Sequence, residues 1–200
     1  MVKIDLKKEL KHLYSASAKE PQLVDVIPLN YLMIDGAGDP NAAEFQQAME
    51  SLYAASYAIK FEAKKAGNDF TVMPPEGLFW SDDPQSFGLE ARDAWKWTLM
   101  IVQPAFVTGA MAMEATQAAR RKKGLKVGLR FEALLEGQSA QIMHIGPYSE
   151  ESTTIKLLHG FICEKGYEFN GKHHEIYLSD PRRAKPERMR TIIRQPVKKL

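Results

Sequence analysis

Apolar side chains recur at every third or fourth position along three segments of the chain. The clearest segment covers residues 42–66, where Phe45, Met49 and Leu52 begin one continuous stripe. A stripe of this period lies along one side of an α-helix and faces a protein core. The pattern predicts amphipathic helices over residues 42–66, 108–123 and 149–165, and a shorter helix over residues 3–14. Asn41 is predicted to cap the first long helix, and Gly67 to end it.

Shorter runs of continuous or alternating apolar residues lie between these helices and predict β-strands. They occupy residues 24–36, 70–80, 93–102, 127–135, 139–145, 173–179 and 190–197. Pro28 interrupts the first run, and we expect it at a strand edge or start because proline donates no ladder hydrogen bond. Glu136-Gly137-Gln138 separates two of the runs and is predicted to be a hairpin turn.

The same three markers occur twice along the chain and in the same order. They are Leu32-Met33-Ile34-Asp35-Gly36 and Ile142-Met143-His144-Ile145-Gly146, then Ser81-Asp82-Asp83-Pro84 and Ser179-Asp180-Pro181, then Gln103-Pro104 and Gln195-Pro196. With the predicted elements, they indicate an α+β fold of two pseudo-symmetric βαββ repeats, over residues 24–104 and 127–197. We expect one domain over residues 1–200, with a mainly antiparallel sheet, helices on one side and a central ligand cleft on the other. A duplicated unit leaves such a cleft between its halves, where small molecules bind.

The bulk composition is that of a globular domain and excludes several classes of function. Hydrophobic residues make up 44% of the 200 residues and charged residues 26%, with a net charge of +2. The basic run at residues 120–123 is typical of the last turn of a helix, so no direct nucleic-acid partner is expected. No apolar run of about 18 residues and no signal core are present, which predicts a cytoplasmic protein without a membrane partner. The single cysteine, Cys163, is interpreted as a small core residue.

Neither a metal nor a cofactor is expected from the sequence. His173 and His174 are adjacent, so a strand would send them to opposite faces, and no spacing of His, Cys and Asp supports zinc. The Gly36-Ala37-Gly38 string is too short for a dinucleotide fingerprint. No nucleophile motif is found either.

Four strings carry a resemblance to a known family. They are residues 141–148 (Gln-Ile-Met-His-Ile-Gly-Pro-Tyr), 174–183 (His-Glu-Ile-Tyr-Leu-Ser-Asp-Pro-Arg-Arg), 75–80 (Pro-Glu-Gly-Leu-Phe-Trp) and 194–197 (Arg-Gln-Pro-Val). Over nearly the whole chain, they resemble the GyrI-like small-molecule-binding domains, a superfamily that includes the effector-binding domains of BmrR and Rob.

The resemblance implies a fold of two βαββ units around a central cleft that binds large, flat and often cationic aromatic compounds. Effector-binding members place a buried glutamate in that cleft. Some stand-alone members hydrolyse the cyclopropyl ring of DNA-alkylating cyclopropanoid compounds. Because this chain carries no DNA-binding motif, the resemblance favours a stand-alone binder or a detoxifying enzyme over a transcription factor. The sequence leaves two functions open: a cyclopropanoid cyclopropyl hydrolase, or a non-catalytic drug-binding or sensing module that acts through an unidentified protein partner.

Glu175 is the strongest candidate for the cleft glutamate. Strand alternation would place Glu175 and Tyr177 on the cleft face, and His174, Ile176 and Leu178 on the face covered by the helix. A carboxylate in a cleft of low dielectric attracts a cation more strongly than one at the surface does. In a hydrolytic mechanism, Glu175 would deprotonate water and Tyr148 would donate to the oxygen of the leaving group.

Glu76 is a second candidate glutamate whose direction depends on how the repeats align. If Ser81 corresponds to Ser179, then Gly77 corresponds to Glu175 and Glu76 points away from the cleft. If Glu76 instead corresponds to Glu175, both carboxylates face the cleft. The Pro74-Pro75 pair makes a bulge reasonable here, and the sequence supports both alignments.

Aromatic and methionine side chains supply the other candidate ligand contacts. Trp80 and Trp97 are predicted as aromatic walls, which attract cationic and flat guests. Tyr31 and Gln141 occupy matched positions in the repeats, two residues before Met33 and Met143. All four are predicted to line the cleft, since methionine adapts to ligands of varied shape.

Overall fold

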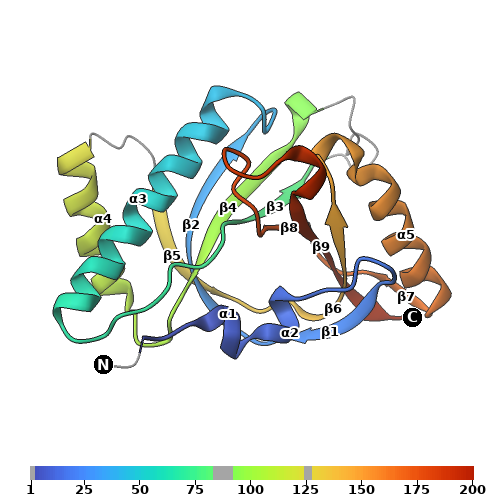
Figure 1. Cartoon of the computed structure of the whole chain (residues 1–200), viewed down its shortest axis with the longest axis horizontal. Helices are drawn as coiled ribbons and strands as arrows, with labels where there is room; N and C mark the ends of the chain where they lie inside the picture. Colours follow the sequence, from blue (N-terminus) through green and yellow to red (C-terminus); the bar gives the residue numbers. More distant parts are fainter. Residues whose placement is uncertain (1–2, 83–91, 124–127) are drawn as a thin grey trace. The chain divides into compact units, whose positions relative to one another are not determined.

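A computed structural model describes residues 3–82, 92–123 and 128–200 of the chain (Figure 1). The fold is α+β, and the paired strands are antiparallel. The chain forms two compact units. Unit 1 contains Met1–Glu9 and Leu29–Leu134, and unit 2 contains Leu10–Pro28 and Leu135–Leu200. In the part of the chain that the structure describes, no helix has the length and apolar character needed to cross a membrane.

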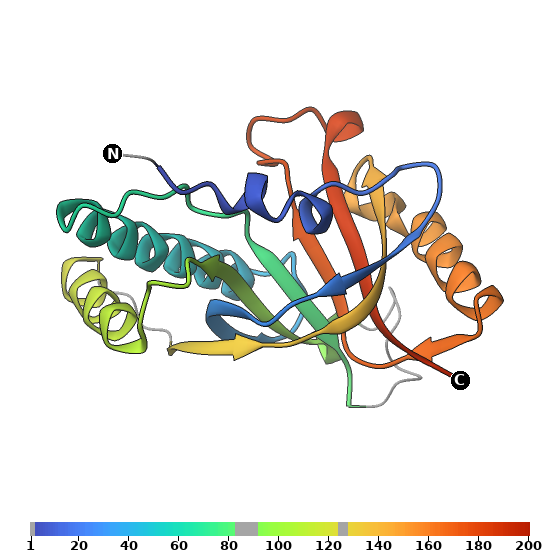
Figure 2. The same cartoon turned by 90° about the horizontal axis from the view of Figure 1, so that it is seen from below.

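Unit 1 has a sheet with the strand order β3-β4-β2-β5. Its elements are α1 (Leu6–Glu9), β2 (Leu29–Ala37), α3 (Ala43–Lys65), β3 (Glu76–Trp80), the short helix η2 (Arg92–Ala94), β4 (Lys96–Gln103), α4 (Gly109–Lys123) and β5 (Leu129–Leu134). Helices α3 and α4 lie side by side, as Figures 1 and 2 show. The predicted helices over residues 42–66 and 108–123 are thus confirmed.

Unit 2 has a sheet with the strand order β8-β9-β6-β1, and β7 also pairs with β9. Its elements are α2 (Lys11–Tyr14), β1 (Gln22–Val26), β6 (Gly137–Ile145), η3 (Tyr148–Glu150), α5 (Glu151–Glu164), β7 (Tyr167–Phe169), β8 (His173–Tyr177), η4 (Pro186–Arg188) and β9 (Arg190–Lys199). If β2, β3, β4 and β5 are matched with β6, β8, β9 and β1, both units have the same strand order. The βαββ repeat is therefore confirmed.

The strand pairing fixes how the two repeats align. Met33 pairs with Met100 of β4, and its counterpart Met143 pairs with Ile192 of β9. The same alignment superposes Gln103 on Gln195, so two of the three repeated markers coincide in the sheets. The third repeated marker does not coincide in the sheets. The register matches Glu76 with Ile176, and under this alignment Ser81 does not match Ser179.

Each sheet has one face packed against a helix of its own unit. In unit 1, the Phe45 side chain of α3 packs on Trp97 and Phe79. In unit 2, α5 covers a core of buried apolar residues: Ala140, Ile142, Leu158, Ile162, Ile193 and Val197. Cys163 lies beside this core but is exposed, so its interpretation as a core residue is wrong.

Two predicted helix starts differ from the structure. Ala42, not Asn41, is the N-cap residue of α3, and Asn41 instead donates to the carboxylate of Asp39. The predicted start of α5 at Ser149 is a 3-10 turn, and the N-cap Glu150 makes no side-chain capping bond. At the other end of α3, Gly67 has a φ of 91°, which suits glycine and ends the helix as predicted.

Two strand predictions also need correction. The run over residues 24–36 is two strands, β1 and β2, which separate at Pro28 and pair in different units. The expected hairpin at Glu136-Gly137-Gln138 is not formed, because β5 pairs with β2 whereas β6 pairs with β1 and β9. The physical reason lies in Glu136, whose carboxylate is buried against Arg194 and His174 within unit 2. A hairpin turn would instead expose that charge to solvent.

Two glycines are expected to respond in opposite ways to the same substitution. A Cβ added to Gly36 would overlap the indole ring of Trp97, its cross-strand partner, so Gly36→Ala should destabilise the protein by about 1–3 kcal/mol. Gly160 lies exposed within α5 with open space around it, so Gly160→Ala should stabilise by about 0.5–1 kcal/mol. Urea unfolding would measure both changes. Equal free energies of unfolding for the two variants would contradict the packing at Gly36.

Candidate functional site

Strand β8 places three polar side chains on one face of the unit 2 sheet. His173, Glu175 and Tyr177 alternate along the strand, so all three point to the same side. The Tyr177 hydroxyl donates to Oε2 of Glu175 over 2.8 Å. The Nε2 of His173 donates to Oε1 of the same carboxylate over 3.0 Å. Both carboxylate oxygens of Glu175 therefore have a partner on their own strand.

This face of β8 is the one that α5 covers, which corrects the predicted direction. Glu175 pairs directly with Ile193, and Ile193 belongs to the core beneath α5. His174 and Ile176 lie on the opposite face and are fully buried. The alternation along the strand was predicted correctly, but Glu175 and Tyr177 lie on the helix side rather than on the face away from it.

Tyr148 joins this group from the turn before α5. Its ring meets the ring of Tyr177 edge to face, with centroids 5.7 Å apart and planes at 79°. His144 holds the turn, since its Nε2 donates to the carbonyl oxygen of Pro147 and its Nδ1 accepts from the hydroxyl of Thr154. Tyr148 is 37% exposed, so part of its ring is available to a ligand.

The electrostatics of the group keep its tyrosine protonated. Burial raises the pKa of Tyr177 well above its usual value, and the nearby carboxylates of Glu175 and Glu151 raise it further. Tyr177 therefore remains a hydrogen-bond donor at any physiological pH. The Glu175 side chain is only 12% exposed, so its interaction with a nearby cation is weakly screened by solvent. The arrangement combines one carboxylate with two tyrosine rings, which suits a flat cationic guest.

The candidate residues of unit 1 lie on the sheet face opposite α3. Glu76 pairs with Met100, which pairs with Met33, so these residues share one face with Tyr31 and Trp80. The register matches Glu76 with Ile176 rather than with Glu175. Glu76 and Glu175 therefore point to opposite faces of their repeats. This is the relative direction expected if Ser81 corresponds to Ser179, although that pair of serines is not itself matched.

Trp97 lies on the other face of the unit 1 sheet. It is 2% exposed, its ring packs at 77° against Phe45 of α3, and it covers Gly36. Trp97 was predicted as an aromatic wall of the ligand cleft, but it lies on the helix side of the sheet and fills the core between sheet and helix. The cause is the absence of a side chain at Gly36, which leaves room for the indole ring.

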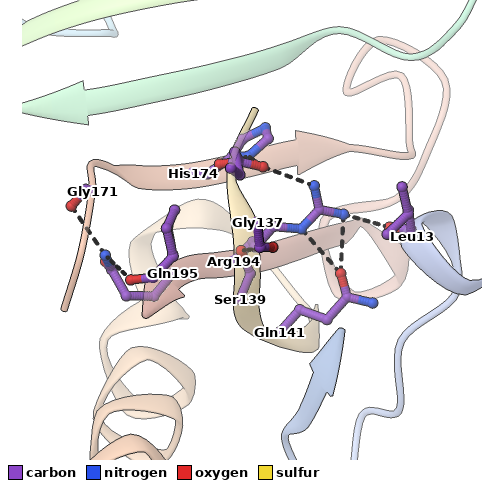
Figure 3. Close-up of polar contacts among 10 residues, drawn as sticks. Leu13, Gly137, Ser139, Gln141, Gly171, His174, Arg194 and Gln195 are labelled. Atoms are coloured by element: carbon purple, nitrogen blue, oxygen red, sulfur yellow. Dashed lines mark hydrogen bonds and ion pairs between the residues drawn. The ribbon is translucent and has the colours of Figure 1, made fainter. Parts of the chain in front are cut away.

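Gln141 is part of a buried polar cluster rather than an open lining (Figure 3). Its Oε1 accepts two hydrogen bonds from the Arg194 guanidinium, and its Nε2 donates to the carbonyl oxygen of His12. Arg194 also binds Glu136 and the carbonyl oxygen of Leu13. This cluster lies on the unit 2 face opposite Glu175, and it ties the segment around α2 to the sheet. Met143 shares that face.

The described residues provide no candidate metal site. Across residues 3–82, 92–123 and 128–200, no group of three His, Cys, Asp or Glu side chains is placed to hold an ion.

The family model of the GyrI-like small molecule binding domain matches residues 19–198, which is most of the chain. The chain belongs to the GyrI-like family. It is thus a small-molecule-binding domain, and the resemblance noted in the sequence is confirmed.

Solved structures from Listeria innocua are similar to this GyrI-like chain over its whole length. A conserved protein is 43% identical with a TM-score of 0.90, and a hydrolase encoded by lin2189 is 42% identical with a TM-score of 0.87. Each comparison covers 98% of this chain and 100% of the other. The C-terminal domain of EcmrR is 11% identical with a TM-score of 0.60, over 90% of this chain and 98% of that domain, and shares the fold alone. No curated protein matches the chain.

His173 is the residue of the GyrI-like site that the sequence analysis missed. The sequence analysis considered His173 only as a metal ligand beside His174. Its prediction that the two side chains lie on opposite faces of a strand is confirmed, since both belong to β8. The available signal was the two-residue spacing of His173, Glu175 and Tyr177, which is the period of a strand. That spacing alone places the imidazole next to the carboxylate.

Proposed function

We propose that this protein binds bulky, planar aromatic small molecules, preferentially cations, at Glu175 of unit 2. The observation that carries the proposal is the Glu175 carboxylate, little exposed and held by His173 and Tyr177, together with the partly exposed ring of Tyr148 that packs on Tyr177. A cation over a tyrosine ring gains about 0.5–2 kcal/mol. A partly desolvated carboxylate adds charge attraction that a neutral guest does not receive.

We also propose that the protein is a hydrolase of strained aromatic substrates, with cyclopropanoid compounds as the substrate class. Support comes from the 42% identity to a Listeria hydrolase over 98% of this chain. In the proposed step, Glu175 accepts a proton from water while the water oxygen attacks a ring carbon. The cyclopropyl carbon–carbon bond breaks, and its electron pair passes to the conjugated carbonyl oxygen, which takes a proton from Tyr148.

The two tyrosines have different tasks in this proposal. Tyr177 already donates to Glu175, and its raised pKa keeps the proton there, so it orients the carboxylate. Tyr148 is more exposed and is the donor to the substrate oxygen. General acid–base help of this kind contributes typically about 10²–10⁴-fold to a rate. Proton exchange through solvent then restores both groups.

Saturable binding of a flat cation is the expected result that tests the site. Ethidium should bind with a dissociation constant in the micromolar range, measured by fluorescence polarisation, and a neutral pyrene alcohol should bind more weakly. Incubation with a cyclopropanoid compound should release the ring-opened phenol, detected by mass spectrometry. Binding without turnover would make the protein a non-catalytic binder. An absence of saturable ethidium binding at high micromolar protein would reject the proposed site.

A further inference from the structure

We propose that His173 sets the net charge of the Glu175 site, and so decides how strongly the protein prefers cationic over neutral ligands. The inference rests on the proposed function, because it concerns the ligand of that same site. It adds a specificity-determining residue and a dependence on pH that the binding proposal alone does not contain.

The geometry couples the imidazole directly to the ligand-binding carboxylate. Nε2 of His173 lies 3.0 Å from Oε1 of Glu175, and their side chains are only 7% and 12% exposed. A neutral His173 donates one hydrogen bond and leaves the pair with a charge of −1. A protonated His173 makes an ion pair and brings the charge of the pair to zero. Histidine changes between these forms in the range from about pH 5 to about pH 8.

The neighbours of His173 do not cancel this change. Tyr177 stays uncharged because its pKa is raised well above the usual value. On α5, Glu151 adds a carboxylate to the group, and His159, about two turns further along the helix, is close enough to interact with His173. Burial lowers the pKa of His159, and the nearby His173 lowers it further, so His159 stays neutral to a lower pH than an ordinary histidine and adds little charge to the site. His159 stacks on Phe169 with ring centroids 4.5 Å apart.

A cation and a neutral guest should therefore respond differently to pH. The cation loses its attraction to Glu175 when His173 is protonated, because the added positive charge lies within hydrogen-bond distance of the carboxylate. Between charges a few ångströms apart in a site of intermediate dielectric, the loss corresponds to a tenfold to hundredfold weaker affinity, in order of magnitude. A neutral aromatic of the same size has no charge attraction to Glu175, so its affinity should not change in this way.

The test uses ethidium, whose charge is permanent, and a neutral pyrene alcohol with the full-length protein. From about pH 8 to about pH 5.5, ethidium affinity should fall at least about tenfold, while that of the pyrene alcohol changes little. In His173→Gln, the amide can still donate to Glu175 but cannot gain a charge, so ethidium affinity should no longer depend on pH. His159→Gln is the matched control and should keep the dependence.

Two results would overturn the inference while leaving the proposed function intact. One is ethidium binding of constant affinity over this pH range in the wild type. The other is a pH dependence that disappears in His159→Gln but persists in His173→Gln. A lack of ethidium binding at every pH would instead overturn the proposed function, and the inference with it.

Discussion

Glu175→Gln is expected to weaken ethidium binding by about tenfold to hundredfold and to leave the binding of a neutral pyrene alcohol almost unchanged. The amide keeps the size of the side chain and can still accept from Tyr177, but it removes the negative charge. Charge-assisted hydrogen bonds and partly desolvated ion pairs contribute about 1–3 kcal/mol, which gives the expected loss. Titration by fluorescence polarisation measures both ligands.

The same variant should lose most of any ring-opening activity, by about 10²–10⁴-fold, because glutamine cannot accept a proton from water. Glu168→Gln is the matched control, since Glu168 is an exposed glutamate of unit 2 that pairs with Lys198. It should bind and react as the wild type does. Equal ethidium affinity of wild type and Glu175→Gln would show that Glu175 does not meet the ligand, and Glu76 would become the next residue to test.

Arg194→Met is expected to reduce the free energy of unfolding by about 3–5 kcal/mol, the largest effect on stability that the structure suggests. Arg194 is 1% exposed and Glu136, its ion-pair partner, 4%. The Arg194 guanidinium is at the centre of the cluster in Figure 3. Methionine matches the length of the stem but leaves the Glu136 carboxylate and the Leu13 carbonyl without this donor. Removing one partner of a buried pair costs about this much. Urea unfolding is the measurement.

Arg182→Met is the matched control, because the Arg182 side chain is 83% exposed and pairs with Asp180 at the surface. Such exposed pairs contribute about 0–1 kcal/mol, so the control should stay within that range. A loss below about 1 kcal/mol in Arg194→Met would show that the cluster contributes little to folding.

Acid should lower the free energy of unfolding of the wild type, because the same cluster loses stabilisation when Glu136 is protonated. His174 and Arg194 lower the pKa of Glu136 to about 2 from 4.5, against the opposing effect of burial. A lowered pKa in the folded state means that the stabilisation is complete above pH 4.5 and is lost as the pH falls toward 2. Urea unfolding at several pH values should show this loss, and the loss should be smaller in Arg194→Met.

The sequence by itself determined the elements and their repetition. The three-and-four spacing over residues 42–66 predicted α3 almost to the residue, because one side of that helix is apolar and the other is not. The repeated Met33 and Met143 strings predicted two βαββ units, and the strand register places these residues at equivalent positions. Along β8, the alternation correctly grouped Glu175 with Tyr177.

Only the tertiary structure decided which face of each sheet meets a helix. In β4, seven consecutive residues are buried, and β9 shows a run of the same length. A strand buried on both faces carries no contrast between apolar and polar sides, so its sequence does not show which side the helix covers. For that reason the pattern of β4 does not show that Trp97 fills the space above Gly36. In β8, no residue of either face is fully exposed, so the alternation groups Glu175 with Tyr177 without showing which side α5 covers.

Long-range pairing also decided the polar contacts. Arg194 binds Glu136 and Gln141, which lie 58 and 53 residues away along the chain. A local sequence pattern does not predict a partner at that distance. His173 is the exception, since its distance from Glu175 is set by the strand period alone. A buried charge is strongly unfavourable unless it is paired, so these groups are buried together. They come within contact distance only when the whole unit has folded.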